Sequence, residues 1–336
     1  MEARGAPPAV PDTREARAGG FSLRARLDGL SVRLESLVVL LLLVVALTVL
    51  SRYFFSVSNF LNILLATSVI GVLAIGETFV ISAAGIDLSI GSLLAFSGAV
   101  GAQTVIALGW PWPLGILACL GAGTLAGSVN GVLIARAGIP PFIVTLGMLG
   151  VARGAGLVLT GGQSIYGLPP PIVFLGQGRL LGIPVPVVVF LLLAVCAHIC
   201  LARTPFGRHI QVIGDNEFAA RAMGIAVDRL RIILYALSGL LAGLAGLLFA
   251  ARVNAADPTA GISYELTAIT ATIIGGTNLF GGRGSVLGTI IGALIMGVLQ
   301  NGLNLLAVQS FYQQMAIGAV LIAAVWLDQA SRQRRT

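Results

Sequence analysis

The chain has 336 residues, of which 57% are hydrophobic and only 10% are charged, a composition typical of an integral membrane protein rather than a soluble enzyme. Its formal net charge is +7, and all of its basic residues are arginines, because the sequence contains no lysine. The absence of lysine excludes a Walker A nucleotide site and a Schiff-base mechanism in this chain. We therefore expect no enzymatic activity and no cofactor, and any ATP that drives a process here must bind to a separate subunit.

Apolar stretches long enough to cross a membrane follow one another along most of the chain. Residues 1–33, rich in Ala, Arg, Gly and Pro, predict a disordered cytosolic tail without a cleaved signal peptide. Residues 34–328 predict a transmembrane domain, and residues 329–336 predict a second cytosolic tail. The predicted fold is all-α, with about ten transmembrane helices, the fifth interrupted by Arg153 and the eighth short. The predicted spans are residues 37–51, 62–83, 88–108, 113–135, 141–160, 184–201, 230–252, 262–277, 285–305 and 312–327.

The arginines indicate which side of the membrane each loop faces. An even number of spans places both termini on one side, and with that side in the cytosol most of the arginines also face the cytosol. This orientation agrees with the positive-inside bias of membrane proteins. Because the basic charge follows the membrane topology, we expect membrane lipid around the chain and no nucleic-acid partner.

Cys119, Cys196 and Cys200 all lie in predicted spans. The spacing of Cys196, His198 and Cys200 suggests a metal site, but on a helix His198 points away from the face that the two cysteines share. We expect these residues to pack against apolar neighbours, with no metal site and no disulfide framework.

A weak internal repeat relates the two halves of the chain. The segment around Asn130 resembles the segment around Asn301, and the polar breaks at residues 83–92 and 275–285 correspond loosely. Paired breaks in two halves are typical of transporters whose pathway lies at the repeat interface. Chance similarity between glycine-rich spans is the alternative interpretation.

Two acidic residues at membrane depth are candidates for the transport pathway. Glu77 lies in the middle of the second span, where it is expected to contact a substrate hydroxyl, pair with an arginine or be protonated. Asp87 precedes an apolar run and either caps the helix that follows or shapes a broken segment beside the pathway. Asn130, Asn278 and Asn301, in the segments related by the repeat, complete the set of pathway candidates.

A polar segment of 29 residues or so, residues 203–231, separates the two apolar halves and contains five arginines and three acids. Within it, the sequence GDNEFAARAMGI predicts a short helix with Asp215 or Asn216 as its N-cap, Glu217 in its first turn and Gly224 just after its end. A helix of about eight residues is roughly 12 Å long and fits a groove on a soluble partner. A solvated loop lying on lipid headgroups is the alternative. The predicted docking residues are Asp215, Asn216, Glu217, Phe218, Ala219, Ala220, Arg221, Met223 and Gly224.

From about residue 36 onward, the sequence resembles the permease subunits of ribose/xylose-type ABC sugar importers. The resemblance is carried by GIDLSIGSLLAFSG (85–98), PPFIVTLGML (140–149), RTPFGRHIQVIGDNEFAARAMGI (203–225) and IIGGTNLFGGRGSVLGTIIGALIMGVLQNGL (273–303). It implies a type II ABC-importer-like permease in a bacterial cytoplasmic (inner) membrane, paired with itself or with a related permease. It also implies two cytosolic ATP-binding subunits and an extracytoplasmic sugar-binding protein as partners.

The resemblance further implies that a cytosolic coupling helix docks the permease on its ATPase. The counterparts of the family's Glu-Ala-Ala…Gly loop are Glu217, Ala219, Ala220 and Gly224, although Phe218 intervenes between the glutamate and the first alanine. The expected function is therefore ATP-driven import of a monosaccharide, in which no residue distinguishes ribose from xylose. An ion-coupled secondary sugar transporter is the main alternative, but such proteins usually carry clustered acids or histidines at membrane depth. A channel or scaffold without energy coupling is a further alternative, which the polar segment argues against.

Overall fold

The computed structural model describes residues 23–333, and the remainder of both predicted tails (1–22 and 334–336) lies outside the described residues. The first helix, α1 (Leu23–Leu50), begins well before residue 34, so the prediction of disorder is wrong for residues 23–33. Leucines in this stretch recur at near-helical spacing, a pattern that extends a helix even where no continuous apolar run exists. At the other end, α13 (Ser310–Gln333) likewise continues into the predicted tail.

The predicted spans coincide with ten apolar helices in the described part of the chain. Six are long and apolar enough to cross a membrane: α2 (Val57–Ser82), α4 (Trp112–Arg136), α5 (Pro141–Thr160), α7 (Val185–Arg203), α10 (Val227–Val253) and α12 (Val286–Leu305). The shorter apolar segments belong to α1, α3 (Ile90–Ile106), α11 (Tyr264–Ile274) and α13.

One predicted span is not a complete crossing. The 11 residues of α11 extend about 17 Å at the usual helical rise, whereas the hydrocarbon core is about 30 Å thick. Residues 258–263, directly before α11, form turns, so the eighth span is a short helix preceded by non-helical chain.

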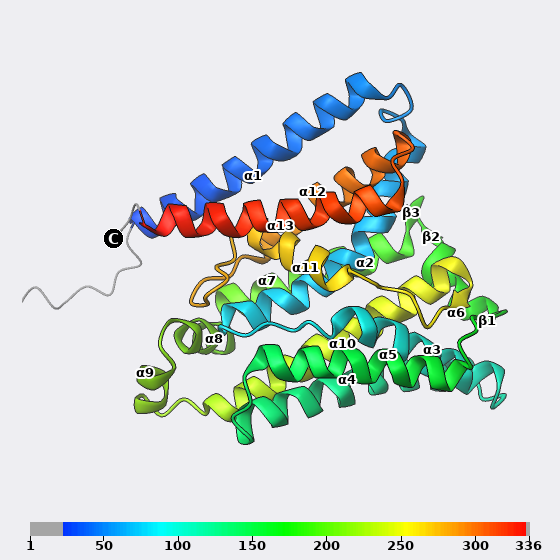
Figure 1. Cartoon of the computed structure of the whole chain (residues 1–336), viewed down its shortest axis with the longest axis horizontal. Helices are drawn as coiled ribbons and strands as arrows, with labels where there is room; N and C mark the ends of the chain where they lie inside the picture. Colours follow the sequence, from blue (N-terminus) through cyan, green and yellow to red (C-terminus); the bar gives the residue numbers. More distant parts are fainter. Residues whose placement is uncertain (1–22, 334–336) are drawn as a thin grey trace, which may run out of the picture.

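Short elements mark the two ends of the helical bundle (Figure 1). One end, which we call the β side, carries α6 (Pro170–Gln177) and two small antiparallel pairs, β1 with β4 and β2 with β3. The strands are β1 (Ile165–Tyr166), β2 (Arg179–Leu180), β3 (Ile183–Pro184) and β4 (Ala255–Ala256). The opposite end, which we call the α9 side, carries α8 (Pro205–Asp215) and α9 (Glu217–Ala222).

The core forms where α10 packs against α2, α3 and α4. A Cβ atom on Gly127 of α4 would collide with the carbonyl oxygen of Tyr235 on α10, and one on Gly239 would collide with the carbonyl oxygen of Gly123. Helices in lipid gain dispersion contacts when small residues let their backbones approach in this way. The glycines along this pair of helices therefore serve close packing.

The chain contains an inverted repeat. In the first half, α2 is followed by a break (residues 83–89), α3, α4 and α5; in the second half, α10 is followed by a break (residues 254–263), α11, α12 and α13. Gly76 of α2 approaches Ser238 of α10, and Gly85, farther along the chain, approaches Tyr235, so the two helices run antiparallel. Corresponding helices of the two halves thus cross the bundle in opposite directions, the arrangement of inverted-repeat transporters.

This order of elements confirms one part of the predicted repeat and corrects another. Asn130 and Asn301 lie at corresponding places, late in α4 and late in α12. The predicted partner of residues 83–92, however, is wrong: residues 275–285 connect α11 to α12, as residues 107–111 connect α3 to α4. The true counterpart is the second break, whose sequence has no resemblance to GIDLS, because repeats of this kind retain backbone geometry rather than side chains.

Candidate functional site

The first break (residues 83–89) is a largely buried, non-helical segment inside the bundle. The Oδ1 atom of Asp87 accepts hydrogen bonds from the backbone N–H and the hydroxyl of Ser89, at 3.0 and 2.5 Å. Its Oδ2 atom accepts the hydroxyl of Ser238 on α10 at 2.8 Å. Asp87 thus binds a backbone N–H group where α3 begins, as the capping interpretation predicts, although Ser89 occupies the N-cap position itself.

Side chains from three other helices hold the same break in place. Asn130 of α4 donates from Nδ2 to the Ser89 hydroxyl at 3.0 Å. The hydroxyl groups of Tyr235 on α10 and Thr145 on α5 both donate to the carbonyl oxygen of Ile86, at 3.3 and 3.4 Å. Interactions with α4, α5 and α10 therefore compensate for the backbone hydrogen bonds that the chain gives up at the break.

Glu77 lies next to this network and is completely buried. Neither carboxylate oxygen reaches hydrogen-bond geometry with a described residue, although the backbone N–H of Asp87 lies near enough to influence its charge. No described arginine forms an ion pair with Glu77, and the charges that act on it are those of two acids, Asp87 and Glu265. Two neighbouring buried carboxylates repel each other when both are charged, and no described base offsets this repulsion.

The two remaining pathway candidates lie elsewhere. Asn278 stabilises the turn at residues 275–285 on the α9 side, donating to the carbonyl of Gly281 at 2.6 Å and accepting the N–H of Phe280 at 3.0 Å. Asn301 exchanges amide hydrogen bonds with Asn59 of α2 at 2.8 and 3.0 Å. The structure therefore brings together Glu77, Asp87 and Asn130, and separates Asn278 and Asn301 from them.

The second break (residues 254–263) begins with β4, which pairs with β1, and its later part is held by one arginine that sequence reasoning did not select as a site residue. The Nη1 atom of Arg153 on α5 donates to the carbonyl oxygens of Pro258 and Ala260, both at 2.7 Å. Asp257 orders the turn that follows it by accepting the N–H and hydroxyl of Thr259, both at 2.7 Å. The sequence did carry a signal for this residue, because Arg153 interrupts an otherwise apolar predicted span.

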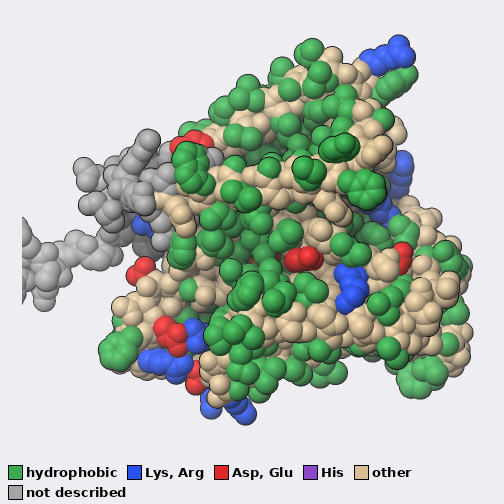
Figure 2. Space-filling view, in the orientation of Figure 1, with side chains coloured by type: hydrophobic (Ala, Val, Ile, Leu, Met, Phe, Trp, Pro, Cys, Tyr) green, Lys and Arg blue, Asp and Glu red, His purple; other side chains and the backbone are tan. Residues whose placement is uncertain are grey.

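The second break meets the start of α3 deep inside the bundle. A Cβ atom on Gly91 would collide with the carbonyl oxygen of Gly261 and the carboxylate of Glu265, which lies in the first turn of α11. The N-terminal ends of two half-helices, α3 and α11, therefore meet between the two breaks. Figure 2 shows acidic and basic atoms side by side in the middle of an otherwise apolar face, and Arg153, Asp257 and Glu265 are all partly exposed.

On the α9 side, the predicted short helix is present as residues 217–222, somewhat shorter than expected. Asn216 is its N-cap and accepts the N–H of Ala219 at 2.9 Å, whereas Asp215 ends α8. Gly224 has φ = +78°, a conformation that favours glycine, and so ends the helix where the sequence predicts.

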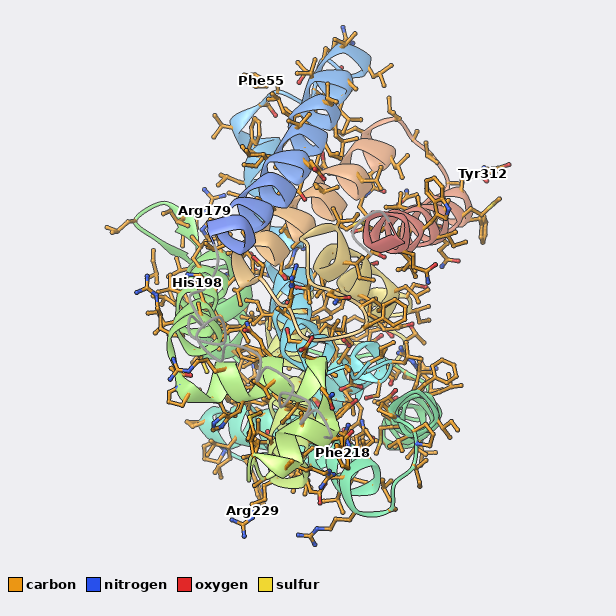
Figure 3. The ribbon with its side chains drawn as sticks, turned by 90° about the vertical axis from the view of Figure 1, so that its left-hand side faces the viewer. Phe55, Arg179, His198, Phe218, Arg229 and Tyr312 are labelled. Atoms are coloured by element: carbon orange, nitrogen blue, oxygen red, sulfur yellow. The ribbon has the colours of Figure 1, made fainter. Side chains whose placement is uncertain are left out.

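The surface of α9 combines an exposed aromatic ring with a neutralised acid. Phe218 is 84% exposed and Met223 is 64% exposed (Figure 3 labels Phe218). Glu217 accepts hydrogen bonds from Arg231 at 2.5 Å and from Arg221 at 3.0 Å. Burial alone would raise the pKa of Glu217, but the hydrogen bonds and charges of Arg231 and Arg221 outweigh it and hold that pKa below its usual range.

The surface helix is connected to the first break through the end of α8. The N–H of Gly282 donates to the carbonyl oxygen of Ser82, the last residue of α2, at 3.1 Å. A Cβ atom on Gly214 of α8 would collide with that same carbonyl oxygen and would lie 2.5 Å from the nitrogen of Gly282. A displacement of α8 and α9 therefore bears directly on the residue that precedes the first break.

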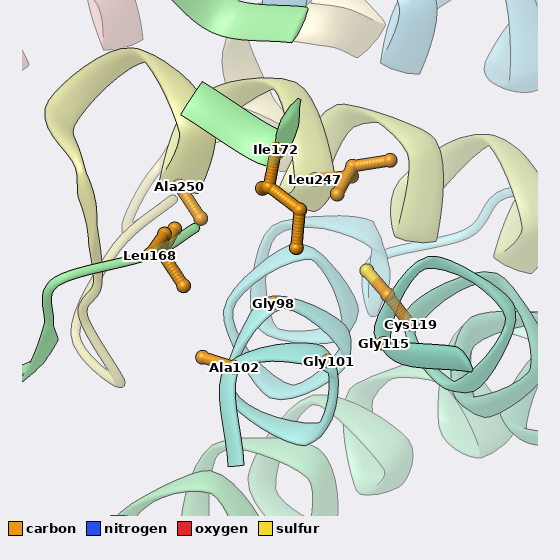
Figure 4. Close-up of a pocket in the computed structure, with 9 residues that line it drawn as sticks. All are labelled: Gly98, Gly101, Ala102, Gly115, Cys119, Leu168, Ile172, Leu247 and Ala250. Atoms are coloured by element: carbon orange, nitrogen blue, oxygen red, sulfur yellow. The ribbon is translucent and has the colours of Figure 1, made fainter. Parts of the chain in front are cut away.

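Other parts of the described chain lack side chains that would bind a polar ligand or a metal ion. An apolar crevice on the β side (Figure 4) is lined by Gly98, Gly101, Ala102, Gly115, Cys119, Leu168, Ile172, Leu247 and Ala250. The thiol of Cys119 donates to the carbonyl oxygen of Gly243 at 3.2 Å, a packing contact between α4 and α10. Within residues 23–333, no group of three or more His, Cys, Asp and Glu side chains has a geometry that holds a metal ion.

An inverted repeat of membrane helices with paired breaks, connected to a surface helix on one side, defines the chain as a transport permease. The family model described as branched-chain amino acid transport system / permease component matches residues 59–325, and the chain belongs to this family.

Curated relatives resemble the chain over most of its length. The ribose import permease protein RbsC of Haemophilus influenzae is 43% identical over 298 residues, covering 88% of this chain and 92% of the relative. The ribose import permease protein RbsC of Bacillus subtilis is 44% identical over 307 residues, covering 91% and 95%. The D-allose transport system permease protein AlsC of Escherichia coli is 40% identical over 277 residues, covering 82% and 85%. No solved structure matches the chain.

Proposed function

We propose that this permease is the membrane subunit of an ATP-driven importer for a monosaccharide, with ribose as the first sugar to test. The observation that carries the proposal is the meeting of two broken segments inside an inverted repeat, one of which touches the base of an exposed surface helix. Similarity to ribose and allose permeases over more than four fifths of the chain supports the choice of sugar class.

The proposed partner at α9 is a separate ATP-binding subunit, present in two copies in the assembled importer. The exposed side chains of Phe218 and Met223 are the apolar surface that a groove on this partner would cover. ATP would be bound and hydrolysed there, so the permease needs no cofactor of its own. An extracytoplasmic sugar-binding protein would deliver the sugar at the β side.

The proposed orientation places the α9 side in the cytosol of a bacterium whose inner membrane holds the chain. The described ends of α1 and α13 lie on this side together with α8 and α9 (Figure 1). Arginines concentrated there agree with the positive-inside bias, whereas Arg52, Arg153, Arg179 and Arg252 lie toward the β side.

The proposed coupling path runs from α9 through α8 to the first break. ATP-dependent closure of the ATPase pair would move α9, and the contact of Gly214 with Ser82 would pass this movement to the end of α2. The break beyond Ser82 is non-helical chain held by side-chain hydrogen bonds, which rearrange at lower cost than a continuous helix. Alternating access then follows from the two halves of the repeat moving around their meeting point.

The proposed assembly contains two permease subunits, either two copies of this chain or one copy and a related chain. Gly147, Gly150 and Gly154 lie along α5, and a Cβ atom added at any of them would meet no described atom within 4 Å. A helix face of small residues that is open in the single chain suits close contact with a second membrane helix.

Uptake measurements test the proposal against its main alternative, an ion-coupled secondary transporter. Labelled ribose, allose and xylose are offered to cells that express the permease with or without its ATPase and binding protein, with the proton gradient collapsed and ATP maintained. ATPase-dependent uptake that survives the collapse supports the importer. Uptake that disappears with the gradient, whether or not the ATPase is present, contradicts it.

A further inference from the structure

The second break exposes a charged group where lipid would penalise it. Arg153 lies roughly 10 Å from the β-side end of α5, within the depth of the hydrocarbon core. An arginine at this depth must face protein, water or a polar ligand. Its guanidinium is turned toward the second break rather than the membrane surface, since Nη1 binds the carbonyls of Pro258 and Ala260.

Within the single chain, several hydrogen-bond donors of Arg153 have no described acceptor. A guanidinium has five N–H donors. Nε and Nη2 have no hydrogen-bond partner among the residues that the structure describes, and no described carboxylate forms an ion pair with Arg153. The charges of Glu265 and Asp257 nevertheless act on it, Glu265 more strongly. Donors and acceptors thus lie near one another without being fully paired.

The acidic members of this group are partly exposed, as Arg153 is. Asp257 uses Oδ1 to bind Thr259, which leaves Oδ2 without a described partner. Glu265 is partly exposed at the start of α11, beside Gly91 of α3. Sugar hydroxyl groups both donate and accept hydrogen bonds, so they complement a site that offers guanidinium donors and carboxylate acceptors together.

We propose that Arg153, Asp257 and Glu265 form a subsite that hydrogen-bonds the hydroxyl groups of the sugar as it passes the second break. This inference rests on the proposed function and adds the residues that recognise the sugar within the permease. Arg153 lies on α5 together with the open glycines Gly147, Gly150 and Gly154. A second permease packed on that helix would enclose the polar group in a passage between the two subunits, away from lipid.

Isosteric replacements separate sugar recognition from support of the fold. Glu265→Gln and Asp257→Asn keep the size of each side chain and remove its charge, whereas Arg153→Lys retains the charge and loses the planar donor array. Arg179→Lys, at an arginine on the β side and outside the group, is the matched control for Arg153→Lys. Each variant is reconstituted in vesicles as the complete importer, with its ATPase and binding protein.

Two quantities are measured for every variant: ATP-driven uptake of the best-carried sugar among ribose, allose and xylose, and uptake of its mono-deoxy analogues. Loss of one hydrogen bond to a charged group lowers uptake of the parent sugar about tenfold. The expected loss is smaller for the one analogue that lacks the hydroxyl group bound by the altered side chain, because that bond is already absent. ATP hydrolysis stimulated by the loaded binding protein stays within about twofold of wild type, and so does uptake by the Arg179→Lys control.

Equal losses for the parent sugar and all deoxy analogues would overturn the subsite and leave the three residues as supports of the second break. Unchanged uptake in Glu265→Gln and Asp257→Asn would overturn it as well. Failure of the proposed function has a different signature, because the wild-type importer would then show no ATP-driven uptake of any of the three sugars.

Discussion

At both breaks of the inverted repeat, backbone polar groups lose their helical hydrogen bonds, and different side chains bind them at each break. The first break is largely buried, with Ala84 exposed, and hydroxyl and amide groups of α4, α5 and α10 bind its polar atoms. The second break is partly exposed and is held by β1 and by Arg153, whose remaining donors have no described partner. The two halves of the inverted repeat therefore share their backbone arrangement, while the side chains around the two breaks differ and suit different roles.

The difference also concerns what each break touches. The first break follows directly after Ser82, which contacts Gly214 at the end of α8, so it lies within reach of the surface helix. The second break contacts α3 and α5 near the open face of the molecule. We infer that the first break receives movement from the ATPase partner and that the second break meets the sugar. Each prediction below tests one side of this division.

The largest effect is expected where α8 touches the first break. Gly214→Ala places a Cβ atom against the carbonyl oxygen of Ser82 and the backbone nitrogen of Gly282, neither of which belongs to a flexible side chain. The contact must open, so we expect sugar uptake to fall at least tenfold while ATP hydrolysis by the assembled importer continues, a separation of hydrolysis from transport. Gly121→Ala is the matched control, because a Cβ atom there meets nothing within 4 Å. Normal uptake in Gly214→Ala would contradict the coupling path.

A second variant removes the ion pairs that hold α9 on the bundle. Glu217→Arg places a third cation beside Arg221 and Arg231, which now share the carboxylate. We expect normal membrane insertion with loss of uptake and of ATPase co-purification. Gly224→Pro should have the same result, since proline is restricted to φ near −65° and this position has φ = +78°. Co-purification and uptake at wild-type levels in both variants would exclude α9 as the docking helix.

The same ion pairs predict how docking depends on pH. Because the pKa of Glu217 is lowered in the folded protein, its contribution is present above the ordinary glutamate pKa of about 4.3 and is lost as the pH falls through the lower folded value. ATPase co-purification should therefore be flat from neutral pH down to about 5 with respect to this residue. A Glu217→Gln variant should remove the Glu217-dependent decline at lower pH, and an unchanged profile would show that other groups control docking.

The exposed ring of α9 should have a moderate effect. Phe218→Ala removes a side chain that is 84% exposed and available to a partner's groove. Truncation of a buried aromatic at an interface commonly weakens binding about tenfold or more. Phe311→Ala is the control, because Phe311 is 73% exposed on α13, near the β side, where no ATPase is expected. Affinity of the purified permease for the ATPase should fall only in the first variant.

The positions of the helices were predictable from the sequence because hydropathy and caps are local signals. Ten apolar runs gave ten helices, and Gly224 and Asn216 end and begin elements as their side chains predict. The shape of the eighth span was less accessible. Residues 262–277 form one apolar run in the sequence, which does not show that the helix covers only Tyr264–Ile274.

The candidate site was predictable only in part, because its members are assembled by tertiary contacts. Glu77, Asp87 and Asn130 do converge, since each is a polar group at membrane depth in the first half of the repeat. Asn278 and Asn301 were chosen from sequence resemblance, which does not follow the geometry of the repeat. Arg153 was noticed as an interruption of a span, but its role depends on carbonyl groups more than a hundred residues away in the sequence.

The smallest effect is expected at Glu77, and it distinguishes the buried break from the exposed one. Glu77 is completely buried beside Asp87 without a described basic partner, so a neutral side chain of the same shape suits its surroundings. Glu77→Gln should change uptake of every sugar by less than about twofold, since it removes a charge that burial already disfavours. Glu265→Gln, the same substitution at the second break, should lower uptake of the parent sugar about tenfold. A sugar-selective loss in Glu77→Gln would place the buried acid on the pathway and would show that both breaks meet the sugar.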